Sequence, residues 1–178
     1  MVMILELNSP SPDKTFNIGE RIGNCLRGDE IILLCGNLGA GKTLMTKGIA
    51  ASLGIDPDEI VSPTFTLLNQ IEFDRERPGK EMRPIVSRFI HFDCYRLADP
   101  GNSRDEPQES IGSGYSGPGL IVPEIDEWID LAVLVVEWAQ YLHRSYFKLG
   151  NSISVHLNIG SGGLRFIRIE SKLKYIRF

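Results

Sequence analysis

The chain has 178 residues, of which 42% are hydrophobic and 24% are charged, and its formal net charge at pH 7 is -4. This length suffices for one well-buried domain and is short for two, so we expect a single domain over residues 1–178. The composition is globular, and the acidic balance argues against direct binding of DNA or RNA, which favours basic surfaces.

The sequence has neither an apolar run of membrane-spanning length nor a basic N-terminal segment followed by a signal core, so we expect a cytoplasmic protein without membrane contact. The histidines have none of the close spacings typical of zinc sites. Three cysteines lie far apart and form no Cys-x-x-Cys pair, which favours buried small hydrophobic side chains over a disulfide framework: Cys25, Cys35 and Cys94.

The first elements are a strand over residues 2–7 and a helix that begins after Ser11-Pro12. Serine is a good N-cap, and proline suits the first helical position because its missing N–H costs nothing there. Gly28 is the expected stop of this helix, whose apolar stripe repeats at four-residue spacing: Ile18, Ile22 and Leu26.

Residues 36–43 match G-x-x-x-x-G-K-[ST], the phosphate-binding P-loop pattern. A continuous apolar run at 30–35 precedes them, as expected of a strand buried on both faces of a parallel sheet. In a P-loop the lysine reaches the β- and γ-phosphates and the hydroxyl holds Mg²⁺. The pattern therefore predicts these nucleotide-binding residues: Asn37, Leu38, Gly39, Ala40, Gly41, Lys42 and Thr43.

A helix follows the loop, with Met45, Ile49 and Leu53 on one face and Gly54 as its C-terminal glycine. After it, a proline turn at 62–64 leads into a half-buried strand predicted over 65–71. Hydroxyls beside a phosphate site can sense the γ-phosphate, whereas threonine is also a common strand residue, and spacing alone leaves both interpretations open.

Two segments interrupt the regular pattern. Residues 74–88 are dense in charge and contain two prolines, which favours a solvated hairpin tip or insertion, with phosphate-binding arginines as the alternative. Residues 99–119 are rich in glycine, serine and proline and predict a mobile loop.

Two carboxylates end apolar runs. Asp93 ends the strand predicted at 89–93, and Glu137 follows the continuous apolar run 131–136. If these strands are parallel to the P-loop strand, both carboxylates reach the sheet edge that holds the loop, where they can orient water or bind a metal. For Asp93, a role as N-cap or as partner of Arg96 is the alternative.

The remaining elements are a short helix over 121–129 and an antiparallel hairpin formed by 153–159 and 164–170. Together the elements predict an α/β fold of the P-loop NTPase type, with a central mixed, mostly parallel sheet flanked by helices and a C-terminal antiparallel hairpin.

Four motifs in order resemble the TsaE family of bacterial ATPases: Gly-Asn-Leu-Gly-Ala-Gly-Lys-Thr, Ser-Pro-Thr-Phe-Thr-Leu, His-Phe-Asp-Cys-Tyr-Arg-Leu and Val-Glu-Trp-Ala. The resemblance implies a magnesium-dependent ATPase, weakly active alone, that acts with TsaB and TsaD in forming N6-threonylcarbamoyladenosine in tRNAs reading codons that start with A. It implies contact with tRNA only through those partners, and ATP and Mg²⁺ as cofactors.

The resemblance also implies roles for single residues. Lys42, Asp93 and Glu137 match catalytic positions, and Thr43 and Glu137 match metal-binding positions. Thr64 and Thr66 become candidates for a nucleotide-sensing switch, with Thr64 in the nucleotide site, and Trp138 is implied to shape the nucleotide pocket.

The chain departs from the family at Leu44, where relatives often have a second threonine, and at 74–88 and 99–119, where relatives are usually shorter. The competing hypotheses are a P-loop small-molecule kinase and a nucleotide-gated adaptor without turnover. In a kinase, the arginines of 74–88 would form a lid over the transferred phosphate. The sequence contains no guanine-reading Asn-Lys-x-Asp motif, which argues against a GTPase switch.

Overall fold

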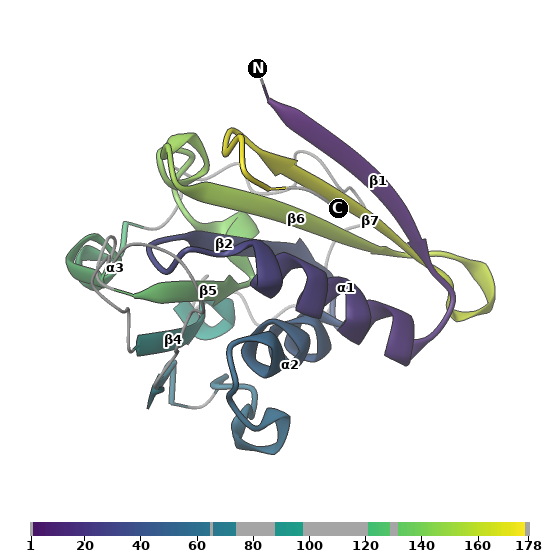
Figure 1. The fold of residues 1–178 in the computed structure, drawn as a ribbon, viewed down its shortest axis with the longest axis horizontal. Helices are drawn as coiled ribbons and strands as arrows, with labels where there is room; N and C mark the ends of the chain where they lie inside the picture. The colour runs from purple at the N-terminus through teal and green to yellow at the C-terminus, as the bar shows by residue number, and fades with distance from the viewer. Residues whose placement is uncertain (1, 65, 74–87, 98–120, 129–131, 177–178) are drawn as a thin grey trace, which may run out of the picture.

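A computed structural model of the protein describes residues 2–64, 66–73, 88–97, 121–128 and 132–176. Within them, one mixed sheet has the order β1-β7-β6-β2-β5-β4-β3 (Figure 1). Its strands are β1 (Met3–Ser9), β2 (Ile31–Gly36), β3 (Leu68–Glu72), β4 (Arg88–Asp93), β5 (Val133–Glu137), β6 (Ser152–Ile159) and β7 (Arg165–Ser171).

The four central strands run parallel. β2 pairs in parallel with β5 on one side and with β6 on the other, and β4 pairs in parallel with β5. β7 and β1 extend the sheet antiparallel beyond β6, and β3 is antiparallel to β4. The predicted α/β P-loop fold and the β6–β7 hairpin are confirmed. The sequence did not indicate that β6 lies directly beside the P-loop strand.

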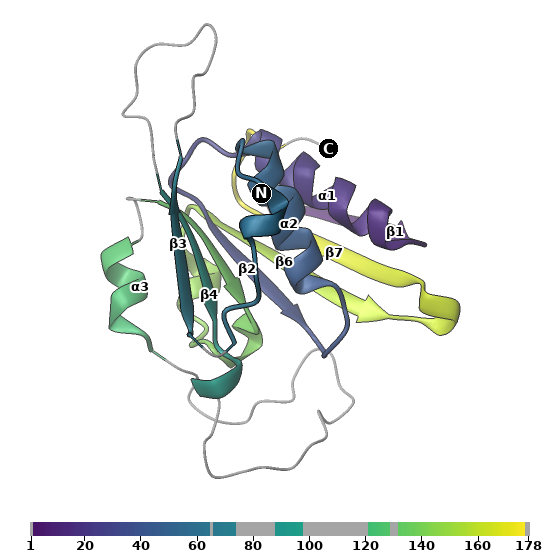
Figure 2. The same ribbon diagram turned by 90° about the horizontal axis from the view of Figure 1, so that it is seen from below.

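Helices cover both faces of the sheet. Figure 2 shows α1 (Pro12–Cys25) and α2 (Lys42–Ser52) on one face and α3 (Pro123–Trp128) on the other. Side chains of β2 that alternate between the faces enter two separate apolar cores, and both sets are almost fully buried. The continuous apolar run of this strand follows from that double coverage.

Two of the predicted helix ends are confirmed and one is wrong. The Ser11 hydroxyl accepts a hydrogen bond from the Lys14 N–H at 3.2 Å, so Ser11 is the N-cap of α1. This helix does not continue to Gly28 as predicted: it ends at Cys25, and Leu26 follows as an extended C-cap residue whose N–H donates to the carbonyl of Gly23. At the end of α2, Gly54 is left-handed (φ 87°) and donates to the carbonyl of Ala51 at 3.0 Å, as a C-terminal glycine does.

The predicted strand over 65–71 begins too early, because β3 starts at Leu68. Leu67 has φ 67°, and its N–H donates to the carbonyl of Pro63 at 2.6 Å. This bond joins Leu67 to Pro63, and the left-handed backbone at Leu67 cannot be part of a pleated strand.

Four other segments were predicted with approximate bounds. The helix over 121–129 is α3, and the strand over 131–136 is β5, one to two residues later. The insertion at 74–88 lies outside the described residues except for exposed Arg88, the first residue of β4, and the loop at 99–119 lies outside them entirely.

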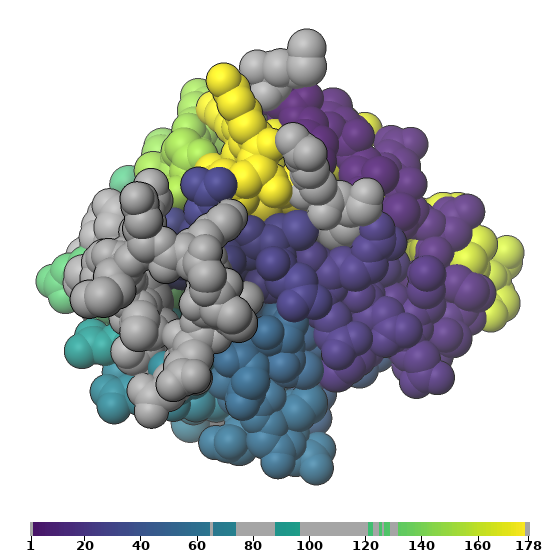
Figure 3. Space-filling model, viewed as in Figure 1, coloured from purple at the N-terminus to yellow at the C-terminus, as the bar shows by residue number. Residues whose placement is uncertain are grey.

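Helices α1 and α2 adjoin on the face seen in Figure 3, and glycines let them pack directly against each other. A Cβ at Gly48 would overlap the carbonyl oxygen of Phe16 in α1.

We expect Gly48→Ala to lower the free energy of unfolding by about 2 kcal/mol, because the overlap outweighs the better helix propensity of alanine. Urea unfolding measures this loss. Gly150→Ala is the control, since a Cβ there has no neighbour within 4 Å. Equal stability of the two variants would contradict the prediction.

Candidate functional site

The loop between β2 and α2 needs glycine at several positions. Gly36, Gly39 and Gly41 have φ angles of 154°, 74° and 102°, which side chains with a Cβ rarely adopt. Gly41 is the N-cap residue of α2, so the loop leads directly into the positive end of that helix dipole. This strand, loop and helix arrangement favours anion binding at the carboxyl edge of the sheet.

Lys42 lies folded back over the loop and is only 5% exposed. Its ammonium group donates to the carbonyls of Gly36 and Asn37 at 2.8 and 2.9 Å, and it stands 3.6 Å from the ring centroid of Trp138. Burial lowers the pKa of Lys42 to about 8, although the charges of Glu137 and Asp93 act in the opposite direction. The site thus contains a cation with little water around it, which strengthens its attraction to a phosphate.

Glu137 ends β5 beside the P-loop helix. Its Oε2 accepts a hydrogen bond from the Thr43 hydroxyl at 2.9 Å, and its Oε1 accepts one from the Thr46 hydroxyl at 3.3 Å. Oε1 also lies 2.7 Å from Nε2 of His91. A buried carboxylate needs such partners, and these three fix the orientation of Glu137 toward α2.

Asp93 ends β4 and is the register partner of Glu137 on β5. Its Oδ2 accepts from the hydroxyls of Thr64 at 2.7 Å and Ser62 at 3.5 Å, and its Oδ1 accepts from the N–H of Tyr95 at 2.8 Å. Asp93 therefore both caps the following 3-10 turn and holds the 62–64 segment at the sheet edge. Thr66 is exposed.

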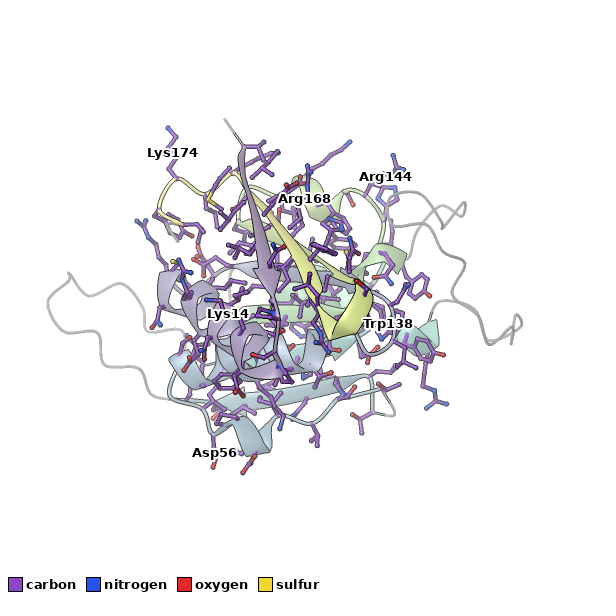
Figure 4. All side chains as sticks on the ribbon, turned by 90° about the vertical axis from the view of Figure 1, so that its right-hand side faces the viewer. Lys14, Asp56, Trp138, Arg144, Arg168 and Lys174 are labelled. Carbon is purple, nitrogen blue, oxygen red and sulfur yellow. The ribbon has the colours of Figure 1, made fainter. Side chains whose placement is uncertain are left out.

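Trp138 follows Glu137 with a left-handed backbone (φ 55°), which turns its ring back under Lys42. The ring, labelled in Figure 4, packs against those of Tyr95 and Tyr141, with centroids 4.8 and 6.0 Å away. Through these contacts Trp138 forms a wall of the site beneath Lys42. In the P-loop itself, Ala40 is buried, whereas Leu38 is 78% exposed.

Sequence reasoning missed four residues that contact this site. His91 was considered only for zinc, yet strand alternation places it on the same face as Asp93, and that signal was available. Thr46 lies one turn after Thr43 on α2. Gln140 and Arg165 contact the backbone of the P-loop from η3 (Ala139–Tyr141) and β7, and no local pattern indicates such long-range contacts.

Of the three cysteines predicted to be buried, Cys35 and Cys94 at this edge are buried, whereas Cys25 at the end of α1 is only half-buried. Burial raises the pKa of Cys35 to about 12, and burial also raises the pKa of Cys94. Both thiols therefore stay protonated at neutral pH and act as small apolar groups.

A glycine loop between a buried parallel strand and a helix, with its lysine and threonine near the acidic residues that end β5 and β4, defines a protein of the P-loop NTPase fold. The model of the family "Threonylcarbamoyl adenosine biosynthesis protein TsaE" matches residues 9–163. The chain belongs to the TsaE family, which functions in the biosynthesis of threonylcarbamoyladenosine in tRNA.

Individual relatives agree with this assignment. The chain is 37% identical to the tRNA threonylcarbamoyladenosine biosynthesis protein TsaE of Aquifex aeolicus over 64% of this chain and 74% of that protein. It is 33% identical to the protein of the same name from Nostoc sp. over 86% and 77% of the two chains. The crystal structure of Bacillus subtilus YdiB has a similar fold, with a TM-score of 0.59 and 21% identity, covering 97% of this chain and 88% of that one.

No helix within the described residues combines the length and the apolar character needed to cross a membrane.

Proposed function

We propose that the protein is a magnesium-dependent ATPase that acts with TsaB and TsaD in forming N6-threonylcarbamoyladenosine in tRNA. Its activity is low alone and is stimulated by these partners, and it meets tRNA only through them. The acidic net charge of -4 supports an indirect contact with RNA.

One observation carries this proposal: the P-loop hydroxyl of Thr43 lies 2.9 Å from the carboxylate of Glu137, while Asp93 is in register with Glu137 on the next strand. Phosphoryl transfer to water needs phosphate binding, charge neutralisation and an oriented nucleophile in one place. The three residues and Lys42 bring groups suited to these tasks to one edge of the sheet.

The oxygen ligands present fit Mg²⁺. Thr43 and Glu137 would hold the ion, since a hydroxyl and a carboxylate are the hard ligands that it prefers. Within the described residues no cluster of three His, Cys, Asp or Glu could hold a metal by itself. Magnesium usually binds through one or two carboxylates together with substrate phosphates, so this site suits an ion that arrives with the nucleotide. When bound, the ion would neutralise phosphate charge.

The other residues act around the phosphates. Lys42 would exchange its loop carbonyls for phosphate oxygens, and amides of residues 37–43 would line the same site. Asp93 would accept a hydrogen bond from the attacking water and orient it. Thr64 already binds Asp93 at 2.7 Å, so a movement of the 62–64 turn would change that orientation. Trp138 shapes the wall below Lys42.

The experiment is ATP hydrolysis by the purified protein, measured as free phosphate, with and without TsaB and TsaD from the same source. We expect slow release alone and several-fold faster release with both partners, together with co-elution. Absence of both stimulation and co-elution would refute the proposal.

The same assay separates the alternatives. A small-molecule kinase would transfer label from γ-labelled ATP to a metabolite, and a nucleotide-gated adaptor would bind ATP without releasing phosphate. The kinase hypothesis relies on the arginine-rich insertion at 74–88, of which residues 74–87 lie outside the described residues. No contact among the described residues favours a kinase.

Nucleotide affinity should fall above about pH 8. Below the pKa of Lys42, about 8, the ammonium is present and attracts phosphate. Above it, binding must take up a proton, so the affinity falls by up to about tenfold per pH unit. ATP titration by calorimetry from pH 7 to 9.5 measures this dependence.

A loss of affinity at high pH cannot be caused by unfolding through Lys42, because the effect of this residue on stability has the opposite sign. The native pKa lies below the ordinary value of 10.5, so between these values folding releases a proton and the contribution of Lys42 to stability rises with pH. Lys47→Ala, on the same helix, should keep the pH dependence of binding. An affinity that stays constant to pH 9.5 would contradict the prediction.

A further inference from the structure

Arg165, the first residue of β7, holds the outer side of the P-loop. Its Nε donates to the carbonyl of Ala40 at 3.0 Å, and its Nη2 donates to the carbonyl of Gly39 at 3.4 Å. Its Nη1 donates to the carbonyl of Gly163 in the hairpin turn at 3.0 Å. One guanidinium group thus joins the C-terminal hairpin to the loop, about 125 residues apart in the chain.

These bonds fix peptide groups that would otherwise turn easily. Gly39 and Gly41 flank Ala40 with left-handed backbones, and glycine has access to many alternatives. Inside the loop the N–H of Ala40 donates to the carbonyl of Asn37 at 3.2 Å, which fixes one turn. The carbonyls of Gly39 and Ala40 then depend on Arg165 for their direction.

The direction of a carbonyl determines that of the next amide. In a trans peptide the C=O of one residue and the N–H of the following residue point in opposite directions. With the carbonyl of Ala40 turned outward to Arg165, the N–H of Gly41 points to the other side of the loop, away from the guanidinium. Gly41 is the N-cap residue of α2, where an amide can meet a phosphate.

We propose that Arg165 is a positioning residue for phosphate binding, which holds the peptide groups between Gly39 and Gly41 with their carbonyls outward and so preorganises the P-loop. The inference rests on the proposed ATP binding. Arg165 acts through the loop backbone. Its planar fork suits two neighbouring carbonyls, which a single ammonium group serves less well.

The first test uses the ligand-free protein. Backbone ¹⁵N relaxation should give order parameters of about 0.85 for the amides of residues 39–41 in the wild type and below about 0.6 in Arg165→Ala. Arg168→Ala is the matched control. Arg168 lies on the same strand, labelled in Figure 4, but strand alternation places it on the opposite face, where it pairs with Glu6 and Glu170. The control should leave the loop rigid.

The second test is calorimetric titration with ATP and with ADP. We expect Arg165→Ala to weaken both by about tenfold, because the loop must be ordered on binding. Arg165→Lys should restore part of the affinity, and Arg168→Ala should bind like the wild type. With TsaB and TsaD present, Arg165→Ala should raise KM for ATP more than it lowers kcat.

Either of two results overturns the inference: loop amides as rigid in Arg165→Ala as in the wild type, or ATP affinities that are equal in Arg165→Ala and Arg168→Ala. If Arg165→Ala does not fold, Arg165→Gln takes its place under the same criteria. A wild-type protein that binds no ATP refutes the proposed function instead, and the relaxation test still decides whether Arg165 orders the loop.

Discussion

Lys42→Ala is expected to weaken ATP binding by about 10²- to 10³-fold and to abolish ATP hydrolysis. The ammonium group of Lys42 lies within 3 Å of two P-loop carbonyls, so it needs only a side-chain rotation to reach a phosphate placed in the loop. Two charged hydrogen bonds to phosphate contribute about 1.5–3 kcal/mol each, and a loss near the lower end of their sum is expected because Lys42 gives up its two loop carbonyls on binding. Calorimetric titration with ATP and with ADP measures it.

The fold should tolerate this change. Lys42 is buried with a lowered pKa, so its charge costs solvation energy in the ligand-free protein, and removing it relieves that cost while losing two hydrogen bonds. We expect the free energy of unfolding to change by less than about 2 kcal/mol. Lys47→Ala is the control for the loss of a lysine from the same helix. ATP binding at wild-type strength by folded Lys42→Ala would show that the loop does not bind nucleotide as proposed.

Features that depend on neighbouring residues in the chain were predictable. The apolar runs before Cys35 and Glu137 had to be strands covered on both faces, and parallel neighbours of this kind end at one sheet edge, so the meeting of Asp93 and Glu137 followed. Ser11 and Gly54 marked helix ends because their capping bonds are local.

Features set by tertiary pairing were not predictable from the pattern. β6 alternates like an ordinary hairpin strand, and nothing local indicates that it pairs in parallel with β2. Arg165 contacts the P-loop only because of that sheet order. The early start predicted for β3 has a different cause: a hydrophobic pattern cannot show the left-handed turn at Leu67 that places Thr64 on Asp93.

The structure also changes how Glu137 must be tested. His91 is fully buried and its Nε2 contacts Oε1 of Glu137, so Glu137→Ala would leave this ring nitrogen without that partner, whereas the Thr46 hydroxyl would keep its hydrogen bond to the Lys42 carbonyl at 3.0 Å. A buried group left unsatisfied costs about 1–3 kcal/mol, and the alanine variant would lose stability and activity together. A variant that keeps the shape of the side chain is therefore required.

Glu137→Gln is expected to lower the magnesium-dependent rate of ATP hydrolysis by about 10²- to 10³-fold, the range found when one charge-stabilising group is removed from a catalytic site. The amide keeps the volume of the carboxylate and one oxygen for Thr43, but it lacks the negative charge that would hold Mg²⁺. Nucleotide binding without magnesium should stay within about threefold of the wild type, because Lys42 and the loop amides are unchanged.

The control is Glu72→Gln. Glu72 ends β3 at the opposite edge of the sheet, where its register partner is Arg88 and where no P-loop residue lies. Steady-state rates per folded molecule, measured across a magnesium titration with TsaB and TsaD present, compare the two variants. If Glu137→Gln turns over ATP as fast as Glu72→Gln at every magnesium concentration, Glu137 does not bind the metal. Its role would then be to orient α2 through Thr43 and Thr46. Asp93, the carboxylate in register on the next strand, would become the candidate metal ligand.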